Sequence, residues 1–235
     1  MPQQMARGLF ITGTDTGVGK TYVTALIARA LKSSGHRVGV YKPVASGCEP
    51  SDDSLVSDDA FTLWQAAGKP GSLEEVCPQR FRAPLAPHLA ARAEDRSVDA
   101  ALLRSGLDVW LASSDIVLVE GVGGLMSPVS DDDYVADLAC EFGFPLLVIS
   151  RDALGTIHQT LTTLITAATI EAGLNVAGII LNELPSSAGD PSIARNRAEL
   201  EARAVAPVLA KVGPHAEEFA EQVDWFELAR ARATR

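Results

Sequence analysis

The sequence is poor in cysteine and in aromatic residues. It has three cysteines, Cys48, Cys77 and Cys140, and only 6% of its residues are Phe, Trp or Tyr. Three cysteines so widely scattered are too few for a disulfide framework or a zinc site. We therefore expect each of them to be a small, buried or half-buried side chain in a reducing compartment.

Long apolar runs and an excess of positive charge are also missing. No apolar run is long enough to span a membrane, and residues 1–7 have no apolar core of signal-peptide length, so we expect a cytoplasmic protein. The formal net charge of −10 argues against nucleic acid and against an anionic membrane surface as partners. The four histidines are not spaced as metal ligands on one helix face, and there is no GxSxG motif of a serine hydrolase.

The chain has enough apolar residues to bury a proper core. Apolar residues make up 47% of the sequence and charged residues 21%, which is typical of a globular protein and not of a disordered one. The length of 235 residues fits one large α/β domain. Because no repeat, low-complexity tract or linker interrupts the sequence, we expect a single domain over residues 1–235.

The segment GLFITGTDTGVGKT, residues 8–21, predicts a phosphate-binding loop. An apolar run at residues 9–11 has the size of a buried strand, a glycine-rich turn follows, and Lys20-Thr21 begins an amphipathic helical pattern. This order is the context of a P-loop, in which backbone amides and a helix N-terminus bind phosphate. Five residues separate Gly13 from Gly19, one more than in the common pattern. A glycine turn with a chance Lys-Thr is the less favoured interpretation.

Three further residues have types and positions that suit a nucleotide site. Lys42 follows a predicted strand at residues 37–41 and precedes a turn that contains Ser46. Glu120 ends the β-branched run at residues 115–119, where a carboxylate could hold Mg²⁺ directly or through water. Asp59 lies at the start of a predicted helix, so helix capping is an alternative role for it. Ligands bind at the carboxyl ends of strands in open parallel sheets, which favours a shared crevice.

Strand and helix patterns alternate along the whole chain and predict an α/β, P-loop NTPase fold with an open, mostly parallel sheet and helices on both faces. We expect the remaining strands at residues 145–150, 176–181 and 207–212, and an acidic loop at residues 48–58. We expect further helices at residues 59–67, 98–103, 134–142, 156–172 and 193–205, and a last helix that begins at His215. The threonines between residues 160 and 169 suit a helix surface better than a site.

Taken together, several segments resemble the dethiobiotin synthetases in order and spacing. The segments are GTDTGVGKT, YKPVASG, SDDA, FRAPLAPHLAA, VEGVGGLMSPV, ADLA, LGTI and IILNE, and they cover roughly residues 8–182. The longer glycine loop is that family's form. These enzymes are cyclo-ligases of biotin biosynthesis that use ATP, Mg²⁺ and carbon dioxide to convert 7,8-diaminononanoate into dethiobiotin. The resemblance implies a carbamate and then a carbamic–phosphoric anhydride as intermediates.

The resemblance also implies a role for each site residue. Lys20 and Lys42 would neutralise the carbamate and the moving phosphoryl group, and Thr16 and Ser46 would hydrogen-bond the carbamate or the diamine. The implied Mg²⁺ ligands are Thr21, Asp59 and Glu120. The residues implied to contact ATP are Gly13, Asp15, Thr16, Gly17, Val18, Gly19, Lys20, Thr21 and, at the adenine edge, Asn182. The residues implied to contact the diamine are Ser46, Pro84, Gly123, Gly155 and His158.

The family is a homodimer that completes the diamine site across its interface, where the helix start at Gly155 and the Gly123 loop of the partner take part, so the resemblance implies a homodimer here with a shared active site. One departure concerns the tail of the substrate. Where the family has Leu-Gly-x-Ile-Asn-His, this chain has LGTIHQ, and near Asn196 it lacks a tyrosine that some members supply. His158 could still donate a hydrogen bond to a carboxylate, as could a helix N-terminus.

Three other functions stay open at this point. A ParA- or MinD-like ATPase switch shares the fold, but it carries a lysine five residues before the P-loop lysine, where this chain has Asp15. A ligase similar to cobyrinic acid a,c-diamide synthetase needs a glutaminase domain, for which 235 residues leave no room. A nucleotide-binding protein without chemistry would leave Lys42 and Glu120 unused.

Overall fold

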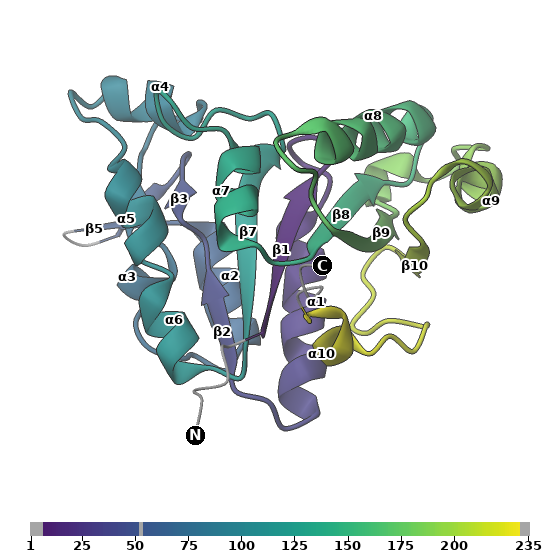
Figure 1. The fold of residues 1–235 in the computed structure, drawn as a ribbon, viewed down its shortest axis with the longest axis horizontal. Helices are drawn as coiled ribbons and strands as arrows, with labels where there is room; N and C mark the ends of the chain where they lie inside the picture. Colours follow the sequence, from purple (N-terminus) through teal and green to yellow (C-terminus); the bar gives the residue numbers. More distant parts are fainter. Residues whose placement is uncertain (1–6, 52–53, 231–235) are drawn as a thin grey trace.

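A six-stranded parallel sheet forms the centre of the molecule (Figure 1). The computed structural model describes residues 7–51 and 54–230. The strand order is β10-β9-β8-β1-β7-β2, and every neighbouring pair is parallel. The strands are β1 (Arg7–Gly13), β2 (Val38–Tyr41), β7 (Ile116–Gly124), β8 (Leu146–Arg151), β9 (Val176–Asn182) and β10 (Val208–Val212). The open parallel sheet predicted from the sequence is confirmed.

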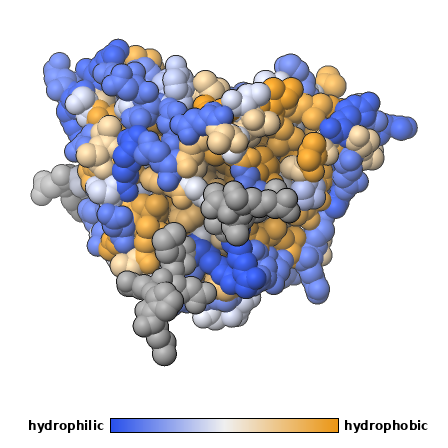
Figure 2. Space-filling view, in the orientation of Figure 1, coloured by the Kyte–Doolittle hydropathy of each residue, from blue (hydrophilic) through white to orange (hydrophobic). Residues whose placement is uncertain are grey.

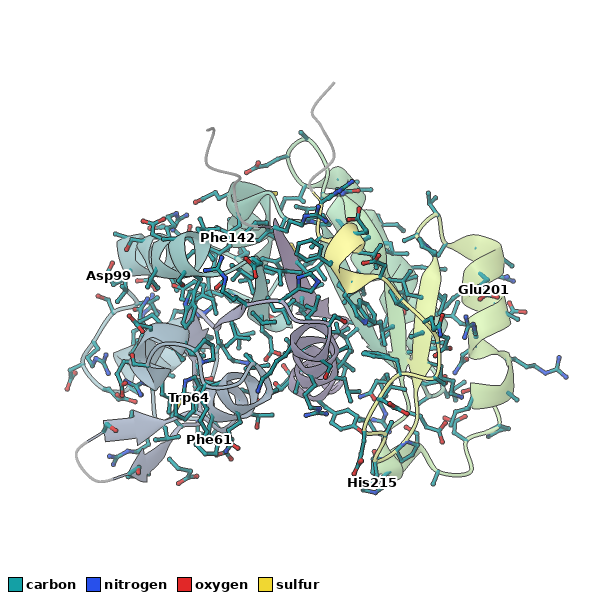
Figure 3. The ribbon with its side chains drawn as sticks, turned by 90° about the horizontal axis from the view of Figure 1, so that it is seen from below. Phe61, Trp64, Asp99, Phe142, Glu201 and His215 are labelled. Carbon is teal, nitrogen blue, oxygen red and sulfur yellow. The ribbon has the colours of Figure 1, made fainter. Side chains whose placement is uncertain are left out.

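Helices cover both faces of this sheet. In the strand order, the chain moves from β1 toward the β2 edge of the sheet, and from β7 to β8 it moves back toward the opposite edge. Because such crossovers are right-handed, α1 (Lys20–Ser33) lies on one face of the sheet and α7 (Val135–Phe142) on the other. Seen from below, Phe61 of α2 (Asp58–Ala66) lies on the α1 side and Phe142 on the far side (Figure 3). The other long helices are α8 (Thr156–Thr169) and α9 (Ile193–Arg203). No helix in residues 7–51 and 54–230 is long and apolar enough to cross a membrane.

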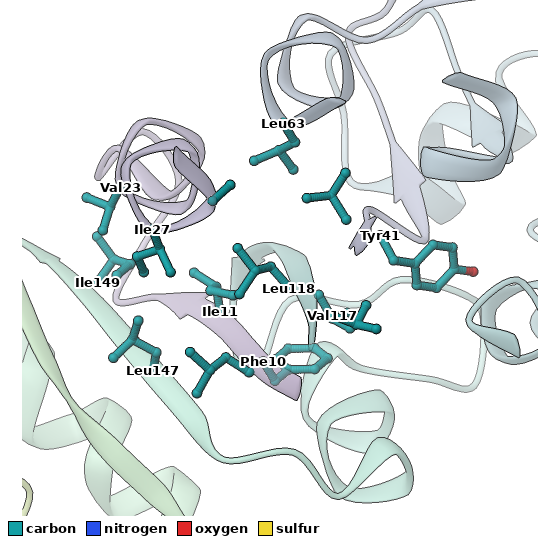
Figure 4. Close-up of a cluster of buried hydrophobic side chains, with 14 of the residues drawn as sticks. Phe10, Ile11, Val23, Ile27, Tyr41, Leu63, Val117, Leu118, Leu147 and Ile149 are labelled. Atoms are coloured by element: carbon teal, nitrogen blue, oxygen red, sulfur yellow. The ribbon is translucent and has the colours of Figure 1, made fainter. Parts of the chain in front are cut away.

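The core forms where α1 packs on the middle of the sheet (Figure 4). Val23 and Ile27 lie one turn apart on the same face of α1, which is the spacing that places two side chains over a sheet. They belong to the same buried cluster as Ile11 of β1 and Leu118 of β7, and all four side chains are fully buried. This packing fixes the start of α1, and with it the loop between Gly13 and Lys20, against the carboxyl edge of the sheet.

Strand β7 is longer than predicted. The sequence predicts that it ends at Glu120, whereas the strand continues through the glycines to Gly124, which pairs with Gly13 of β1. Glycines are poor strand formers, and here they let two backbones approach closely: a Cβ at Gly124 would lie 3.2 Å from the carbonyl oxygen of Gly13. Glu120 is therefore a fully buried strand residue.

The segment between β2 and β7 contains more structure than the sequence predicts. The expected loop at residues 48–58 includes a small antiparallel pair, β4 (Glu49–Ser51) and β5 (Ser54–Val56). The short strands β3 (Val44–Ala45) and β6 (Gln79–Arg80) pair with each other. Two short helices that the sequence does not predict, α3 (Leu73–Val76) and α6 (Asp108–Ser113), accompany α4 (Pro87–Arg92), into which the expected loop at residues 81–89 runs, and the expected α5 (Ala100–Ser105). Elements this short carry too few residues to show a period.

The prediction of a C-terminal helix that begins at His215 was wrong. The segment has a helical composition, yet between residues 215 and 230 only α10 (Trp225–Leu228) is helical, and His215 has a φ of +58°. Contacts with the rest of the molecule explain the difference. Glu221 binds the Arg197 guanidinium at 2.7 Å and the Lys211 backbone amide at 3.2 Å, and the Tyr22 hydroxyl donates to the Ala216 carbonyl. Tertiary contacts here override helix propensity.

Candidate active site

The loop between β1 and α1 has the backbone geometry of an anion site. Gly17 and Gly19 have φ values of +74° and +88°, which favour glycine. A Cβ at Gly13 would lie 2.8 Å from the Asp15 carbonyl oxygen, and one at Gly19 would lie 2.1 Å from the Asn182 side-chain nitrogen. No side chain fits at either position, so the backbone amides of the loop stay open to a phosphate.

Lys20, the first residue of α1, folds back over this loop. Its Nζ donates to the Asp15 carbonyl at 3.2 Å, and only 7% of the residue is exposed. Burial lowers the pKa of Lys20, and the nearby Glu120 carboxylate opposes that shift. The Lys20 side chain thus places a poorly hydrated ammonium group above the loop. A phosphate bound in the loop would bring a negative charge next to this group and stabilise its charged form.

A second lysine lies between two carboxylates at the same edge of the sheet. The Lys42 Nζ, just after β2, donates to Asp59 Oδ2 at 2.5 Å and to Glu120 Oε1 at 2.7 Å. The Thr21 hydroxyl donates to the same Glu120 oxygen at 2.8 Å. Four residues predicted separately from the sequence therefore meet in one cluster, one from each of α1, α2 and β7 and one that follows β2. We call it the Lys42 cluster: Thr21, Lys42, Asp59 and Glu120.

The charges of the Lys42 cluster stabilise one another. Burial alone would lower the pKa of Lys42, which is 2% exposed, but Glu120 and Asp59 outweigh burial and hold it above its ordinary value. Burial likewise opposes ionisation of Asp59, but Lys42 holds the pKa of that carboxyl below its usual range. The cluster thus contains a cation and an anion that are both charged at neutral pH. The Asp59 side chain is 49% exposed, which leaves it open to a ligand.

The oxygen atoms of this cluster fit a magnesium ion. One oxygen of the buried Glu120 carboxylate, Oε2, has no hydrogen-bond partner, which is a costly state for a buried charged group. The Thr21 hydroxyl and the Asp59 carboxylate are the other hard oxygen donors close to it, and Mg²⁺ prefers such ligands together with water and phosphate oxygens. Within the described ranges no three His, Cys, Asp or Glu residues form a complete metal site by themselves. A site of this kind needs a nucleotide to complete it.

Two glycine turns carry residues that the sequence predicts to contact the substrate, near the carboxyl edge of the sheet. A Cβ at Gly123 would lie 3.5 Å from the Thr16 hydroxyl, so the end of β7 lies against the phosphate loop. The Gly47 amide donates to the Ala83 carbonyl at 3.1 Å, and a Cβ at Gly47 would lie 3.6 Å from Pro84. The turn that contains Ser46 therefore lies beside the exposed Pro84.

The predicted substrate residues on α8 lie apart from the Lys42 cluster. Gly155 caps α8 with a φ of +98°, and both Gly155 and His158 are exposed. Among the described residues, no hydrogen bond or ion pair joins His158 to the phosphate loop.

Asn182, at the end of β9, contacts the phosphate loop directly. Its side-chain amide donates to the Val18 carbonyl at 2.9 Å, and the residue is 1% exposed. The neighbouring Asp15 uses its carboxylate to accept the Thr16 amide at 2.7 Å. Asn182 therefore supports the phosphate loop from the end of β9.

Sequence reasoning missed a group of buried polar residues at the ends of β8 and β10. Asp152 is fully buried, accepts the Asn196 amide at 2.8 Å and lies 3.0 Å from the Lys211 Nζ. Ser150 and Thr160 are also fully buried, so the threonines of α8 are not all on a helix surface. The only available signal was a serine and an aspartate directly after an apolar strand, a common arrangement at strand ends.

Solved structures with a similar fold are P-loop NTPases. Signal recognition particle receptor FtsY from Elizabethkingia anophelis in complex with GDP has a TM-score of 0.52 and 14% identity, covering 97% of this chain and 64% of that one. FtsY from Mycoplasma mycoides has a TM-score of 0.51 and 15% identity, covering 97% of this chain and 68% of that one. Likeness at this level of identity shows the fold alone.

Comparison of sequences identifies the family to which the chain belongs. A family model described as an AAA domain matches residues 7–221. The ATP-dependent dethiobiotin synthetase BioD of Rhodopirellula baltica is 45% identical over 219 residues, which cover 88% of this chain and 84% of that protein. The protein of the same name from Anaeromyxobacter dehalogenans is 43% identical over 198 residues, covering 83% and 84%. That of Caulobacter vibrioides is 38% identical over 179 residues, covering 75% and 80%. With such identity across most of both chains, and a phosphate loop beside a lysine–carboxylate cluster, the chain belongs to the ATP-dependent dethiobiotin synthetase family.

Proposed function

We propose that this protein catalyses the ATP-dependent carboxylation and ring closure of 7,8-diaminononanoate to dethiobiotin, with ADP and phosphate as the other products. Membership of the family supports this reaction. The observation that carries it is the position of Lys42, a buried cation between Glu120 and Asp59 beside the phosphate loop. A site that only bound a nucleotide would have no use for a second buried lysine there.

The reaction begins when carbon dioxide adds to one amine of the substrate and forms a carbamate. A carbamate oxygen then attacks the γ-phosphorus of ATP, ADP leaves, and the second amine attacks the carbamate carbon and expels phosphate. Negative charge gathers on the transferring oxygens at each step, so catalysis consists mainly of positioning and charge stabilisation. Lys42 and Lys20 supply the positive charge, and Thr16 and Ser46 donate or accept hydrogen bonds at the carbamate.

The nucleotide and its metal ion would bind along the carboxyl edge of the sheet. The loop residues that follow β1 receive the phosphates, and Asn182 supports the adenine side. Thr21, Asp59 and Glu120 would hold Mg²⁺, and the unpaired Glu120 Oε2 supports that assignment. When bound, the ion neutralises charge on the phosphate oxygens.

The diamine would lie between the Lys42 cluster of one subunit and the start of α8 of the other, because the family completes this site across the dimer interface. Gly123 and Pro84 flank its reactive end, because one borders Thr16 and the other borders the turn that contains Ser46. Gly155 and His158 would receive its carboxylate tail, since the first turn of a helix favours an anion.

We further propose that residues 1–235 form one domain and that the protein acts as a homodimer. Apolar side chains gather on the face that carries α7 and α8 (Figure 2). Leu154 is 86% exposed and Ile165 of α8 is 64% exposed, which is unusual for large apolar residues unless a partner covers them. Leu154→Asp would place a charge in this interface, and we expect it to yield monomers in sedimentation analysis. A variant that stays dimeric would place the interface elsewhere. The cytoplasmic location stays a prediction.

The proposed reaction is tested by measuring phosphate release from MgATP with and without 7,8-diaminononanoate and bicarbonate. We expect release to require both substrates and dethiobiotin to appear in equal amount. Release that ignores the diamine would instead indicate an ATPase switch, and the proposed reaction would be wrong.

A further inference from the structure

The hydroxyl group of Tyr22 connects the first turn of α1 to a turn near the other end of the chain. It donates a hydrogen bond to the carbonyl of Ala216, which lies 194 residues further along the sequence. The Tyr22 side chain is half-buried, and burial raises the pKa of its hydroxyl, so this group keeps its proton at neutral pH. Tyr22 follows directly after Lys20 and Thr21, and its side chain extends to the C-terminal segment.

Residues 213–216 form a tight turn, which we call the 213–216 turn. The Ala216 amide donates to the Gly213 carbonyl at 3.3 Å. The second residue is Pro214 and the third, His215, has a φ of +58°, which is the pattern of a type II turn. Glycine or asparagine is usual at the third position, because other side chains are strained there. A strained turn persists only where contacts hold it in place, and the Tyr22 hydroxyl makes such a contact.

The 213–216 turn begins beside Asn182. Strand β10 ends at Val212, which pairs in register with Asn182 of β9, and the Glu183 amide donates to the Val212 carbonyl at 2.8 Å. Asn182 in turn donates to the Val18 carbonyl of the phosphate loop at 2.9 Å. The ends of β9 and β10 and the first turn of α1 therefore lie next to one another at the carboxyl edge of the sheet.

The direction of a bound nucleotide follows from the position of the Lys42 cluster. This cluster, whose oxygen atoms suit Mg²⁺ beside the terminal phosphate, lies on the β7 and β2 side of β1. A nucleotide whose terminal phosphate lies there has its nucleoside on the opposite side of β1, where β9 and β10 end. Within residues 7–51 and 54–230, the exposed Pro214 carbonyl and His215 amide have no hydrogen-bond partner. A backbone acceptor and donor at neighbouring residues can pair with the polar edge of a nucleobase.

We propose that Tyr22 is a positioning residue for the nucleoside of ATP: its hydroxyl holds the 213–216 turn against α1, where the turn contacts the base. The inference rests on the proposed function only in taking ATP as the nucleotide. Without this hydrogen bond the strained turn has more conformations, and a nucleotide has to order the turn when it binds. Loss of the bond therefore weakens the contacts of the base. The contacts of the phosphates stay unchanged, because β1, α1 and Asn182 hold the phosphate loop.

The experiment compares two ligands that differ by the nucleoside: Mg·AMP-PNP, and magnesium tripolyphosphate, which has the phosphates without ribose or base. Calorimetry with the full chain gives the dissociation constant of each ligand. The variant is Tyr22→Phe, which keeps the ring and removes only the hydroxyl. Tyr41→Phe is the matched control, because the buried Tyr41 hydroxyl also donates to backbone carbonyls, those of Leu102 and Leu103 in α5 at 3.0 Å. Thermal unfolding gives the stability of both variants.

In Tyr22→Phe we expect the dissociation constant of Mg·AMP-PNP to rise about fivefold, the ratio that the loss of one hydrogen bond gives, and that of magnesium tripolyphosphate to match the wild type. In Tyr41→Phe both constants should match the wild type, although the protein is less stable. An unchanged constant for Mg·AMP-PNP in Tyr22→Phe would overturn the proposal. An equal loss for tripolyphosphate would also overturn it, because Tyr22 would then support the phosphate loop. An equal loss for Mg·AMP-PNP in Tyr41→Phe would overturn it as well, because lower stability would then explain the effect.

Failure of the proposed function has a different signature, because the binding experiment uses no diamine and needs no turnover. A wild-type protein that binds Mg·AMP-PNP but makes no dethiobiotin refutes the function, and the binding constants still decide the inference. A wild type that makes dethiobiotin, with a Tyr22→Phe variant that binds Mg·AMP-PNP equally tightly, refutes only the inference. A wild type that does not bind Mg·AMP-PNP refutes both.

Discussion

Removing the ammonium group of Lys42 is the sharpest test of the site. Lys42→Met keeps most of the side-chain volume and removes the charge. Glu120 is then left fully buried, with the Thr21 hydroxyl as the remaining partner of one carboxylate oxygen and none for the other. The substitution therefore has two effects, one on stability and one on turnover, and they can be measured separately.

The effect on stability follows from the burial of the pair. Breaking a buried ion pair by removing one partner costs about 3–5 kcal/mol. The contact with Asp59 adds little, because that side chain is half exposed and solvent screens it. For a chain of this size each kcal/mol corresponds to about 2–4 °C, so the melting temperature should fall by roughly 6–20 °C. In the double variant Lys42→Met/Glu120→Gln neither charge remains, and most of the stability should return.

The effect on turnover follows from the proposed role of the cation. Loss of one group that stabilises developing charge lowers kcat by about 10²–10³. Binding of ATP should change little, because we assign the phosphate contacts to Lys20 and the loop amides. Phosphate release gives kcat, calorimetry gives the dissociation constant of ATP, and thermal unfolding without Mg²⁺ or nucleotide gives the stability.

Two results would refute this reasoning. If Lys42→Met keeps most of its turnover, the lysine has no role in the chemistry. If the double variant is no more stable than Lys42→Met, the buried Glu120 charge is not what destabilises the single variant.

Two further predictions concern the loop and the edge of the sheet. Gly19→Ala should weaken nucleotide binding by more than about tenfold in calorimetry, because the new Cβ would lie 2.1 Å from the Asn182 side chain. Gly35→Ala is its control, with the same φ of +88° and nothing within 4 Å, and equal losses in both would contradict the role of the clash. Asp115→Asn should reduce the free energy of unfolding at neutral pH, since hydrogen bonds from Arg37 hold the pKa of Asp115 below its ordinary 3.8. That contribution is present above pH 3.8 and disappears as the pH falls through the lowered pKa. The free energies of unfolding of the two proteins, measured in urea, should therefore become equal in acid. A difference that does not change with pH would exclude the ion pair as its source.

Several site residues could be found from the sequence because local patterns mark them. The glycines, Lys20 and Thr21 belong to one short segment whose strand, loop and helix are each recognisable alone. Lys42 and Glu120 follow β-branched or apolar runs, and the carboxyl ends of parallel strands share one edge of the sheet. Lys42 and Glu120 lie within hydrogen-bond distance of each other because both are placed at this edge by neighbouring strands.

The sequence could not indicate which polar residues near the site are buried. Ser150 and Thr160 lie ten positions apart and belong to different elements, so no local period joins them. Their contact depends on how α8 lies on β8. The same limit explains the C-terminal segment, whose helical composition is overridden by bonds from Arg197 and Tyr22.

The sequence by itself determined the parallel α/β architecture, the phosphate loop and the membership of the family, because each follows from periods and motifs confined to short stretches. The tertiary structure alone decided that Lys42 lies between two carboxylates, that one Glu120 oxygen is unpaired, and that the Tyr22 hydroxyl connects α1 to the 213–216 turn. Those features are distances between residues far apart in the chain, and packing sets such distances.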